Sequence, residues 1–314
     1  MASSSTKRIT QFVIQGYEPG SQGHEPVIQE HEPVIPAPAV TRSGKRRFSK
    51  DYSAPSSGER PAVRHQSPWD SYERRMEVKL DMWLCMTKRR DGKEGVFAVR
   101  TFPRENSEAV LKRCTSLVHP HLVTVYEVFR TESAEENLFV VSEELQFSLD
   151  HVVACGEIPS DGELASIIGQ VLDALSYLHA QSLIHGSLTC SNTLVRFDGV
   201  VKIAGYWESD TCHGSSEHTG DITAAGHIMM QLMQDHQSTD GKIRVVDRQR
   251  SKEILDFLAA IASELSASEL LKHEYLAHGN GKPKWHPGQL SYLLTVTAYS
   301  SQVCYRRQKK QKRL

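Results

Sequence analysis

A polar loop at residues 185–192 contains side chains of the kind that carry out chemistry in enzymes. It reads His-Gly-Ser-Leu-Thr-Cys-Ser-Asn and brings together the imidazole of His185, the hydroxyl of Ser187 and the amide of Asn192. The loop holds no carboxylate. A hydroxyl without an adjacent base cannot accept a proton from a substrate, and one neutral amide is a poor ligand for Mg²⁺. The residue types therefore argue against acid–base or metal chemistry in this loop.

Apolar spacing predicts the elements that hold this loop. A capping-box pattern, Ser-Asp-Gly-Glu at 160–163, opens an amphipathic helix that runs to about residue 180 with a leucine-rich stripe. Two apolar runs, 193–195 and 200–204, follow the loop and are separated by Phe-Asp-Gly at 197–199. An Asp-Gly pair between apolar runs is typical of a hairpin. The sequence Gly205-Tyr206-Trp207 comes directly after this hairpin.

This order of helix, loop and hairpin resembles the catalytic core of the protein kinases. In that family the loop reads His-Arg-Asp-Leu-Lys-x-x-Asn and the hairpin ends in Asp-Phe-Gly. Here the spacing is intact, but Ser187 stands at the catalytic aspartate position and Gly205 at the metal-binding aspartate position. The resemblance covers residues 75–278 and is nearest to the PAK group of serine/threonine kinases.

The resemblance implies an α+β, bilobal, protein-kinase-like domain over residues 66–285. The small, β-rich lobe with helix C would span about 70–145, and the larger, mostly helical lobe about 146–280. The activation segment between Gly205 and Asp221 is short and lacks Ala-Pro-Glu, so we expect a truncated segment and a shortened end of the large lobe.

Local patterns give the elements expected within the two lobes. Residues 76–86, 96–102, 125–129 and 138–141 are predicted to be strands, and 105–117 a helix with Asn106 or Ser107 as its N-cap. The segment 254–276 is expected to be largely helical, and Asp221 to open the helix after the activation segment.

The nucleotide-binding positions that the resemblance implies are Arg100, Asn192 and Gly205, all of them vestigial. Arg100 replaces the family's phosphate-binding lysine, and it is either such a vestige or a surface or interface cation. The helix-C glutamate position falls on Val110, while Glu108 lies on a different helix face. Residues 76–88, where a glycine-rich loop belongs, contain no glycine.

Two positions that are structural in the kinase family are retained. His185 would brace the loop after the hairpin, and Asp221 would hold the backbone of the catalytic loop. The structural residues of the family are retained, whereas the catalytic and metal-binding carboxylates are missing. We therefore expect a pseudokinase that acts as an interaction or regulatory module, with no catalytic residue, metal or cofactor. Its expected partner is another protein, such as an active kinase. The alternative is a residual or atypical serine/threonine kinase that binds ATP and Mg²⁺ and transfers phosphate.

The flanking sequences differ in composition from this domain. Residues 1–65 are rich in proline, serine and glycine, carry a weak seven-residue repeat and are expected to be disordered. Residues 286–314 form a C-terminal extension with a basic tail. The basic clusters at 45–50 and 306–313 leave nucleic acid open as a weaker partner class.

Composition limits the remaining protein classes. The chain has 314 residues, is 39% hydrophobic and has a formal net charge of −1. Its six cysteines show no paired spacing, which favours a reducing compartment. No apolar run reaches the length of a membrane helix, about 18 residues, and no secretory signal is evident. An intracellular protein, cytoplasmic or nuclear, is therefore expected.

Overall fold

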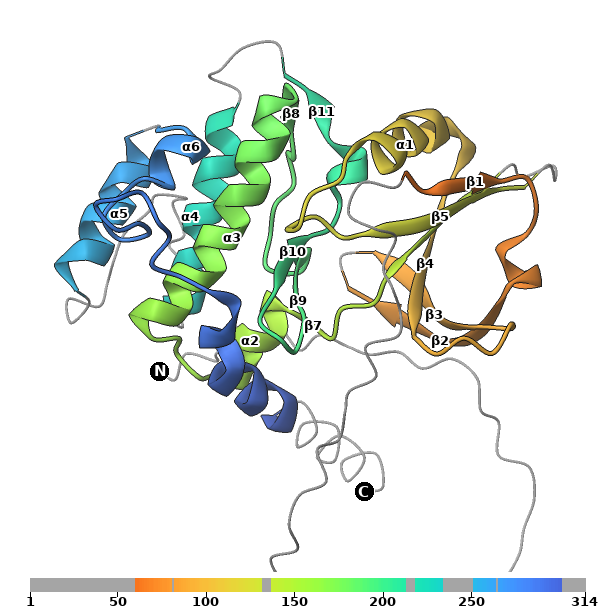
Figure 1. Ribbon diagram of the computed structural model, residues 1–314, viewed down its shortest axis with the longest axis horizontal. Coiled ribbons are helices and arrows are strands. Elements are labelled where there is room, and N and C mark those ends of the chain that lie inside the picture. Colours follow the sequence, from red (N-terminus) through yellow and green to blue (C-terminus); the bar gives the residue numbers. More distant parts are fainter. Residues whose placement is uncertain are drawn as a thin grey trace, which may run out of the picture.

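The chain folds into a β-rich small lobe and a mostly helical large lobe, and this arrangement confirms the expected bilobal kinase-like fold (Figure 1). A computed structural model describes residues 60–80, 82–131, 137–212, 218–233, 251–263 and 265–300. The seven-residue repeat and both basic clusters lie outside these residues. Disorder is expected over residues 1–65, but residues 62–64 form a strand.

The small lobe is a twisted sheet with one long helix against it. Its elements are β1 (Ala62–Arg64), η1 (Pro68–Asp70), β2 (Tyr72–Lys79), β3 (Trp83–Arg89), β4 (Phe97–Phe102), α1 (Arg104–Ser116), β5 (Val125–Arg130) and β6 (Leu138–Glu143). Within the described residues the strand order is β1-β5-β6-β4-β3-β2, and only the β1–β5 pairing is parallel. Figure 1 places α1 beside β1 and β5 at one edge of this lobe.

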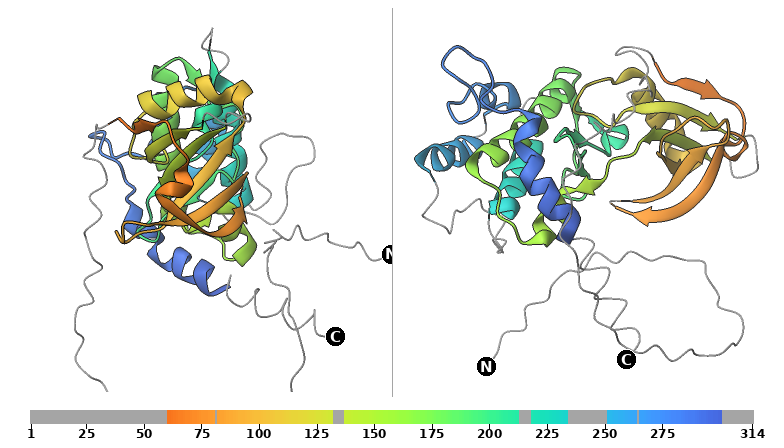
Figure 2. Two further views of the ribbon diagram at one scale, coloured as in Figure 1. Left: turned by 90° about the vertical axis from the view of Figure 1, so that its right-hand side faces the viewer. Right: turned by 60° about the horizontal axis from the view of Figure 1, so that its bottom comes forward.

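The large lobe surrounds the central helix α3. It contains β7 (Phe147–Ser148), α2 (Leu149–Cys155), α3 (Asp161–Ala180), β8 (Leu183–Ile184), β9 (Thr193–Val195), β10 (Val201–Ile203), η2 (Tyr206–Glu208), β11 (Asp210–Thr211), α4 (Thr219–Met233), α5 (Lys252–Ala262), α6 (Ala267–Leu270) and η4 (Pro287–Leu290). Residues 291–300 are also helical. Two further views show the last helix lying across one end of this lobe (Figure 2).

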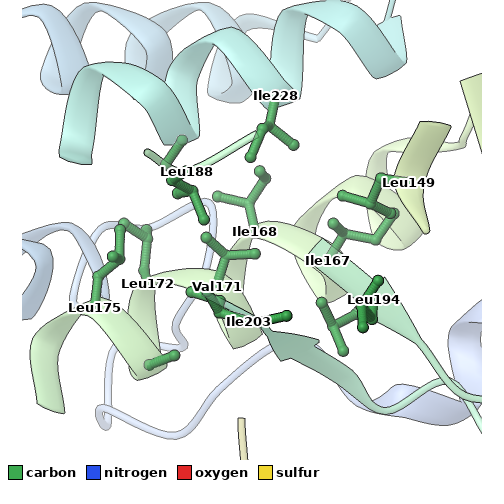
Figure 3. Close-up of a cluster of buried hydrophobic side chains, with 14 of the residues drawn as sticks. Leu149, Ile167, Ile168, Val171, Leu172, Leu175, Leu188, Leu194, Ile203 and Ile228 are labelled. Atoms are coloured by element: carbon green, nitrogen blue, oxygen red, sulfur yellow. The ribbon is translucent and has the colours of Figure 1, made fainter. Parts of the chain in front are cut away.

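Helix α3 forms where the sequence predicts it and is buried over most of its length. The Ser160 hydroxyl accepts from the Glu163 N–H, and the Glu163 carboxylate accepts from the Ser160 N–H, which completes the capping box. Leucine, isoleucine and valine side chains of α3 then meet α2, the β9–β10 hairpin and α4 in one continuous core (Figure 3). This core fixes the hairpin and the loop before it.

Two local predictions in the small lobe are wrong in detail. The predicted strand at 76–86 is two strands, β2 and β3, joined by a tight turn in which the Leu80 N–H donates to the Met82 carbonyl at 3.2 Å. The apolar alternation continues through this turn because Leu80 and Met82 are themselves partly buried against the main core. Helix α1 begins at Arg104 with Pro103 as N-cap, whereas the sequence predicts Asn106 or Ser107 there.

The predicted helix at 254–276 is interrupted. Helix α5 ends at Ala262, and α6 starts again after Ser266, whose side chain forms a second capping box with Glu269. Because serine side chains satisfy free N–H groups at a helix start, this serine favours a new helix over continuation of the old one.

Residues 285–297, here called the C-terminal strap, pack on the large lobe although the sequence predicts that the domain ends at residue 285. The side chains of Leu290, Leu293 and Leu294 are buried in the main core. The Ser166 hydroxyl of α3 donates to the His286 carbonyl at 2.9 Å. Part of the expected extension therefore belongs to the folded lobe.

Glycines of the large lobe create the space that the strap fills. A Cβ atom on Gly169 of α3 would lie 2.3 Å from the indole nitrogen of Trp285. A Cβ atom on Gly199, in the β9–β10 turn, would lie 1.8 Å from the Pro287 carbonyl oxygen. Side chains at these two positions would exclude the strap.

Candidate functional site

The backbone of the loop at 185–192 is hydrogen-bonded to the side chain of Asp221 in α4. The Asp221 carboxylate accepts from the backbone N–H groups of His185, at 2.8 Å, and Gly186, at 2.9 Å, and lies 3.0 Å from the Nε2 of His179. Burial by itself would raise the pKa of Asp221, but the hydrogen bonds from His179 and from the two N–H groups outweigh it, so the pKa is lowered. The buried carboxylate thus stays ionised and fixes the loop backbone.

His185 is a buried structural side chain in this arrangement. Its Nε2 lies 2.9 Å from the Ala204 carbonyl, and its Nδ1 lies 3.4 Å from the Ser187 N–H. The residue is 3% exposed. Because both ring nitrogens already face backbone groups, this histidine joins the loop to the end of the hairpin.

The side chain of Asn192 closes the same loop from the inside. Its Oδ1 accepts from the Thr189 N–H at 2.9 Å, and its Nδ2 donates to the Ser187 carbonyl at 2.7 Å. Ser187 itself is exposed in the loop. The amide therefore shapes the loop, and the catalytic aspartate position carries only a serine.

Gly205 lies beside His185 and Asn192. Its φ angle is +90°, and a Cβ atom there would be 3.4 Å from the His185 Nε2 and 3.7 Å from the Asn192 Nδ2. A side chain at this position would adopt a strained left-handed conformation. The structure thus brings together His185, Asn192, Gly205 and Asp221 in one place, without an acid that could bind a metal ion at residue 205.

Arg100 is buried, so the expectation of a surface or interface cation is wrong. The residue is 1% exposed, its Nη1 donates to the Ser142 hydroxyl at 2.9 Å, and its guanidinium lies 4.9 Å from the Trp207 ring centroid. Trp207 is fully buried and also makes an edge contact with Phe102. The planar cation therefore packs inside the protein on the residue that follows Gly-Tyr.

Helix α1 offers no carboxylate at the position where the kinase family has its glutamate. Val110 is buried there, with 1% exposure. The Glu108 side chain is 77% exposed, and its carboxylate binds the Arg130 guanidinium at 2.6 Å. The family's lysine–glutamate ion pair is therefore replaced by an arginine–tryptophan contact, with a buried valine at the glutamate position.

The β2–β3 turn lies where a kinase has its glycine-rich loop. It contains no glycine, and Leu80 and Met82 pack against the main core. Backbone amides can approach phosphates closely only where side chains leave room. The turn thus presents apolar side chains toward the core where that family presents bare backbone.

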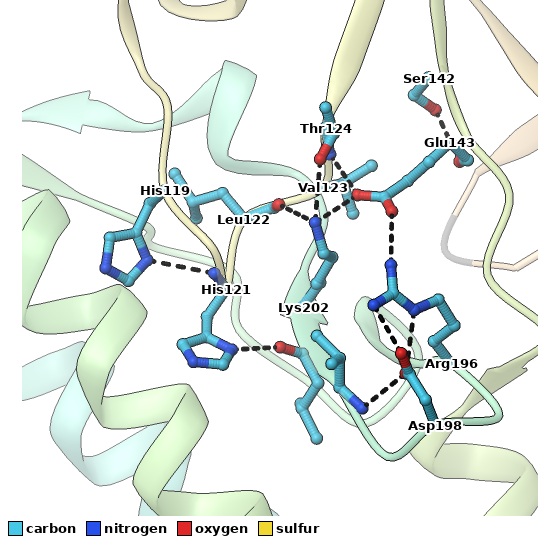
Figure 4. Close-up of polar contacts among 12 residues, drawn as sticks. His119, His121, Leu122, Val123, Thr124, Ser142, Glu143, Arg196, Asp198 and Lys202 are labelled. Carbon is cyan, nitrogen blue, oxygen red and sulfur yellow. Dashed lines mark hydrogen bonds and ion pairs between the residues drawn. The ribbon is translucent and has the colours of Figure 1, made fainter. Parts of the chain in front are cut away.

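A buried ion pair between β10 and β6 is a feature that the sequence patterns did not predict. The Lys202 ammonium of β10 lies 2.5 Å from the Glu143 carboxylate of β6 and also donates to the Leu122 carbonyl and the Thr124 hydroxyl (Figure 4). Arg196 approaches the same carboxylate at 3.7 Å. Alternating strand residues give no signal for this contact, because its partners come from both lobes.

The segment after the site is short in the structure as well. Strand β11 pairs with β8, and α4 starts at Thr219, so only residues 212–218 separate β11 from α4. Of these, 213–217 lie outside the described residues. Across the described part of the chain, no cluster of three or more His, Cys, Asp or Glu side chains could hold a metal ion. The helices described here are too short or too polar to cross a membrane.

The comparisons with known proteins include a family model and several protein kinases. The model of the protein kinase domain matches residues 86–226. The chain is 32% identical over 105 residues to mitogen-activated protein kinase sma-5 of Caenorhabditis elegans, covering 33% of this chain and 21% of that protein. It is 26% identical over 125 residues to a probable cell division protein kinase of Encephalitozoon cuniculi, covering 38% and 40%.

A plant protein belongs to the same group of relatives. Serine/threonine protein kinase OSK3 of Oryza sativa is 28% identical over 111 residues, covering 35% of this chain and 21% of the plant protein. The aligned part of this chain thus spans one to two fifths of the length of these relatives.

Proposed function

We propose that this chain is a catalytically impaired member of the protein kinase superfamily that acts as an interaction module. The observation that carries the proposal is the position of Arg100. Its guanidinium is buried between Ser142 and Trp207, whereas a phosphate-binding cation would have to reach the cleft between the lobes. Moving it outward would cost the ring contact and the buried hydrogen bond.

The loop chemistry supports the same proposal. The Ser187 hydroxyl is not a general base, and loss of a general base alone lowers a rate by about 10²–10⁴. Gly205 offers no ligand for Mg²⁺, and Asn192 is already hydrogen-bonded within the loop. These deficits fall on one chemical step, so their effects do not simply add.

The scaffold that remains is suited to presenting a surface. Asp221 and His185 fix the loop and the β9–β10 hairpin, and the Lys202–Glu143 pair fixes this hairpin to β6. The partner we propose is another protein, and an active kinase fits a domain of this ancestry. We propose an intracellular location and derivation from a serine/threonine kinase, with the PAK group suggested by the sequence of the region around residues 147–180.

A thermal melt of the full chain with ATP tests the proposal. A ligand that binds only the folded state raises Tm, by an amount equivalent to about 2.7 kcal/mol at a concentration of 100 times Kd. We expect a cooperative transition that ATP leaves unchanged, with or without Mg²⁺ or Mn²⁺. An active kinase of similar size, melted with the same ATP solution, serves as the positive control and should show an increase in Tm.

A shift that requires the metal ion would refute the proposal and favour the residual kinase. Phosphate transfer that is abolished by Asn192→Ala or Arg100→Ala would then identify the groups that this kinase reuses. A shift with ATP alone would refute the nucleotide-independent scaffold, because the shape presented to a partner would then depend on nucleotide.

A further inference from the structure

Strand β1 is an addition at the edge of the small-lobe sheet. It pairs in parallel with β5, with Ala62 opposite Glu127, Val63 opposite Val128 and Arg64 opposite Phe129. The rest of the sheet, β2 to β6, is complete without it. The edge of β5 is thus covered by three residues of the same chain, as the position of β1 beside β5 shows in Figure 1.

A carboxylate gives this edge a chemical preference. Arg64 reaches diagonally to Glu127, with its Nε at 3.1 Å and its Nη2 at 2.8 Å from the same carboxylate oxygen. The other oxygen of Glu127 accepts from the Tyr72 hydroxyl at 2.7 Å. Tyr72 is fully buried, and the Arg89 guanidinium lies 5.6 Å from its ring centroid.

This carboxylate is built into the sheet and does not depend on Arg64 for its position. The Glu127 side chain is 11% exposed, and the tyrosine that orients it belongs to a separate aromatic-rich core cluster of the small lobe. A nearly buried carboxylate is costly without a cation beside it. Arg89 also interacts electrostatically with Glu127, but the arginine that hydrogen-bonds its carboxylate is Arg64 on the covering strand. A strand that covers the edge of β5 is therefore favoured if it brings an arginine to this position.

The strand now in place is held lightly. All three residues of β1 are exposed, Val63 at 42% and the Arg64 side chain at 46%. Pro61 is buried beside them, and η1 further along the chain is anchored by Trp69, which packs against Phe139. Apart from Pro61, residues 60–64 bury little side-chain surface, and η1 has its own anchor in the contact between Trp69 and Phe139.

We propose that the edge of β5 at residues 127–129 is a docking site for an extended, arginine-containing segment of a partner protein, and that β1 occupies this site in cis. Main-chain hydrogen bonds to β5 would supply affinity, and the Glu127–Tyr72 pair would select the arginine. The inference rests on the proposed function, because it names a surface for the interaction module. Its test uses no nucleotide, so the two proposals can fail separately.

Fluorescence anisotropy of a labelled peptide with the sequence of residues 60–66 tests this site on the full chain. In the wild-type chain, β1 competes with the peptide. Arg64→Ala weakens the cis strand and leaves Glu127 and Tyr72 intact, so we expect the peptide to bind this variant roughly five- to tenfold more tightly. Arg60→Ala removes a charge from the same segment but keeps the Arg64–Glu127 pair, and it should bind the peptide like the wild type.

Two further changes identify the groups involved. Adding Glu127→Gln to Arg64→Ala should abolish the gain, and so should a peptide in which Arg64 is replaced by glutamine. Hydrogen exchange gives a second measurement: amides of residues 127–130 should exchange faster in Arg64→Ala and regain protection with saturating peptide.

Three results would overturn the inference. The first is an Arg64→Ala chain that melts like the wild type but binds the peptide no better. The second is equal binding by the glutamine peptide, which would show that no arginine is selected. The third is loss of the cooperative melt in Arg64→Ala, which would make β1 a structural strand and not an exchangeable one.

Discussion

The contact between the C-terminal strap and the β9–β10 turn gives a prediction whose size follows from the structure. Gly199 has φ +84°, and a Cβ atom there would lie 1.8 Å from the Pro287 carbonyl oxygen. That carbonyl would have to retreat by about 1 Å or more to reach contact distance. Gly92 has a similar φ, +77°, but a Cβ atom on it would have no other atom within 4 Å.

The two glycines separate backbone strain from loss of the strap. An alanine forced into the left-handed region costs about 1–2 kcal/mol at either position. At Gly199 the retreat of the strap also weakens the burial of Leu290, Leu293 and Leu294, each of which contributes about 1.5–3 kcal/mol. We therefore expect Gly199→Ala to cost at least about 2 kcal/mol more than Gly92→Ala, or roughly 4–8 °C in Tm.

Thermal and urea melts of the full-length variants measure this difference. A second pair checks it without a left-handed φ: Gly169→Ala in α3 meets the Trp285 indole, whereas Gly220→Ala in α4 meets nothing within 4 Å. Alanine normally favours a helix over glycine by about 1 kcal/mol. Gly220→Ala should thus be neutral or stabilising and Gly169→Ala destabilising. Equal losses for Gly199→Ala and Gly92→Ala would refute the assignment of the strap to the folded lobe.

Three other predictions concern buried polar groups. Asp221→Asn should destabilise the fold by about 1–3 kcal/mol at neutral pH. Because the folded-state pKa of Asp221 is lowered, the stability that its carboxylate contributes is present above the unfolded pKa and is lost as pH falls through the folded pKa. The difference in unfolding free energy between wild type and variant, measured by urea melts, should therefore disappear in acid. Lys202→Met leaves the Glu143 carboxylate buried without its ammonium and should cost about 3–5 kcal/mol, while Lys202→Met with Glu143→Leu should recover part of that loss in the same melts. Burial raises the pKa of the Cys114 thiol to about 12, so mass spectrometry should find it unalkylated by iodoacetamide at pH 8 until the chain is unfolded, and rapid labelling in the folded state would contradict the packing of α1.

The sequence alone was sufficient for the elements whose signals are local. Helix α3 follows from its capping box and apolar stripe, and the β9–β10 hairpin from two apolar runs around Asp-Gly. The missing carboxylates at Ser187 and Gly205 are also plain in the sequence, because residue identity at a known spacing needs no coordinates. The β2–β3 turn was missed, since its apolar side chains continue the alternation of the strands beside it.

Tertiary contacts decided what the polar residues do. Arg100 has the same sequence context whether it faces the cleft or the interior, and only Ser142, 42 residues away, and the ring of Trp207 place it inside. A hydrogen bond that holds the strap joins residues 120 apart, and the Lys202–Glu143 ion pair joins residues 59 apart. Such contacts form because a buried polar group without a hydrogen-bond partner is energetically costly. Which residue becomes that partner depends on the tertiary fold, because the two can lie far apart in the sequence.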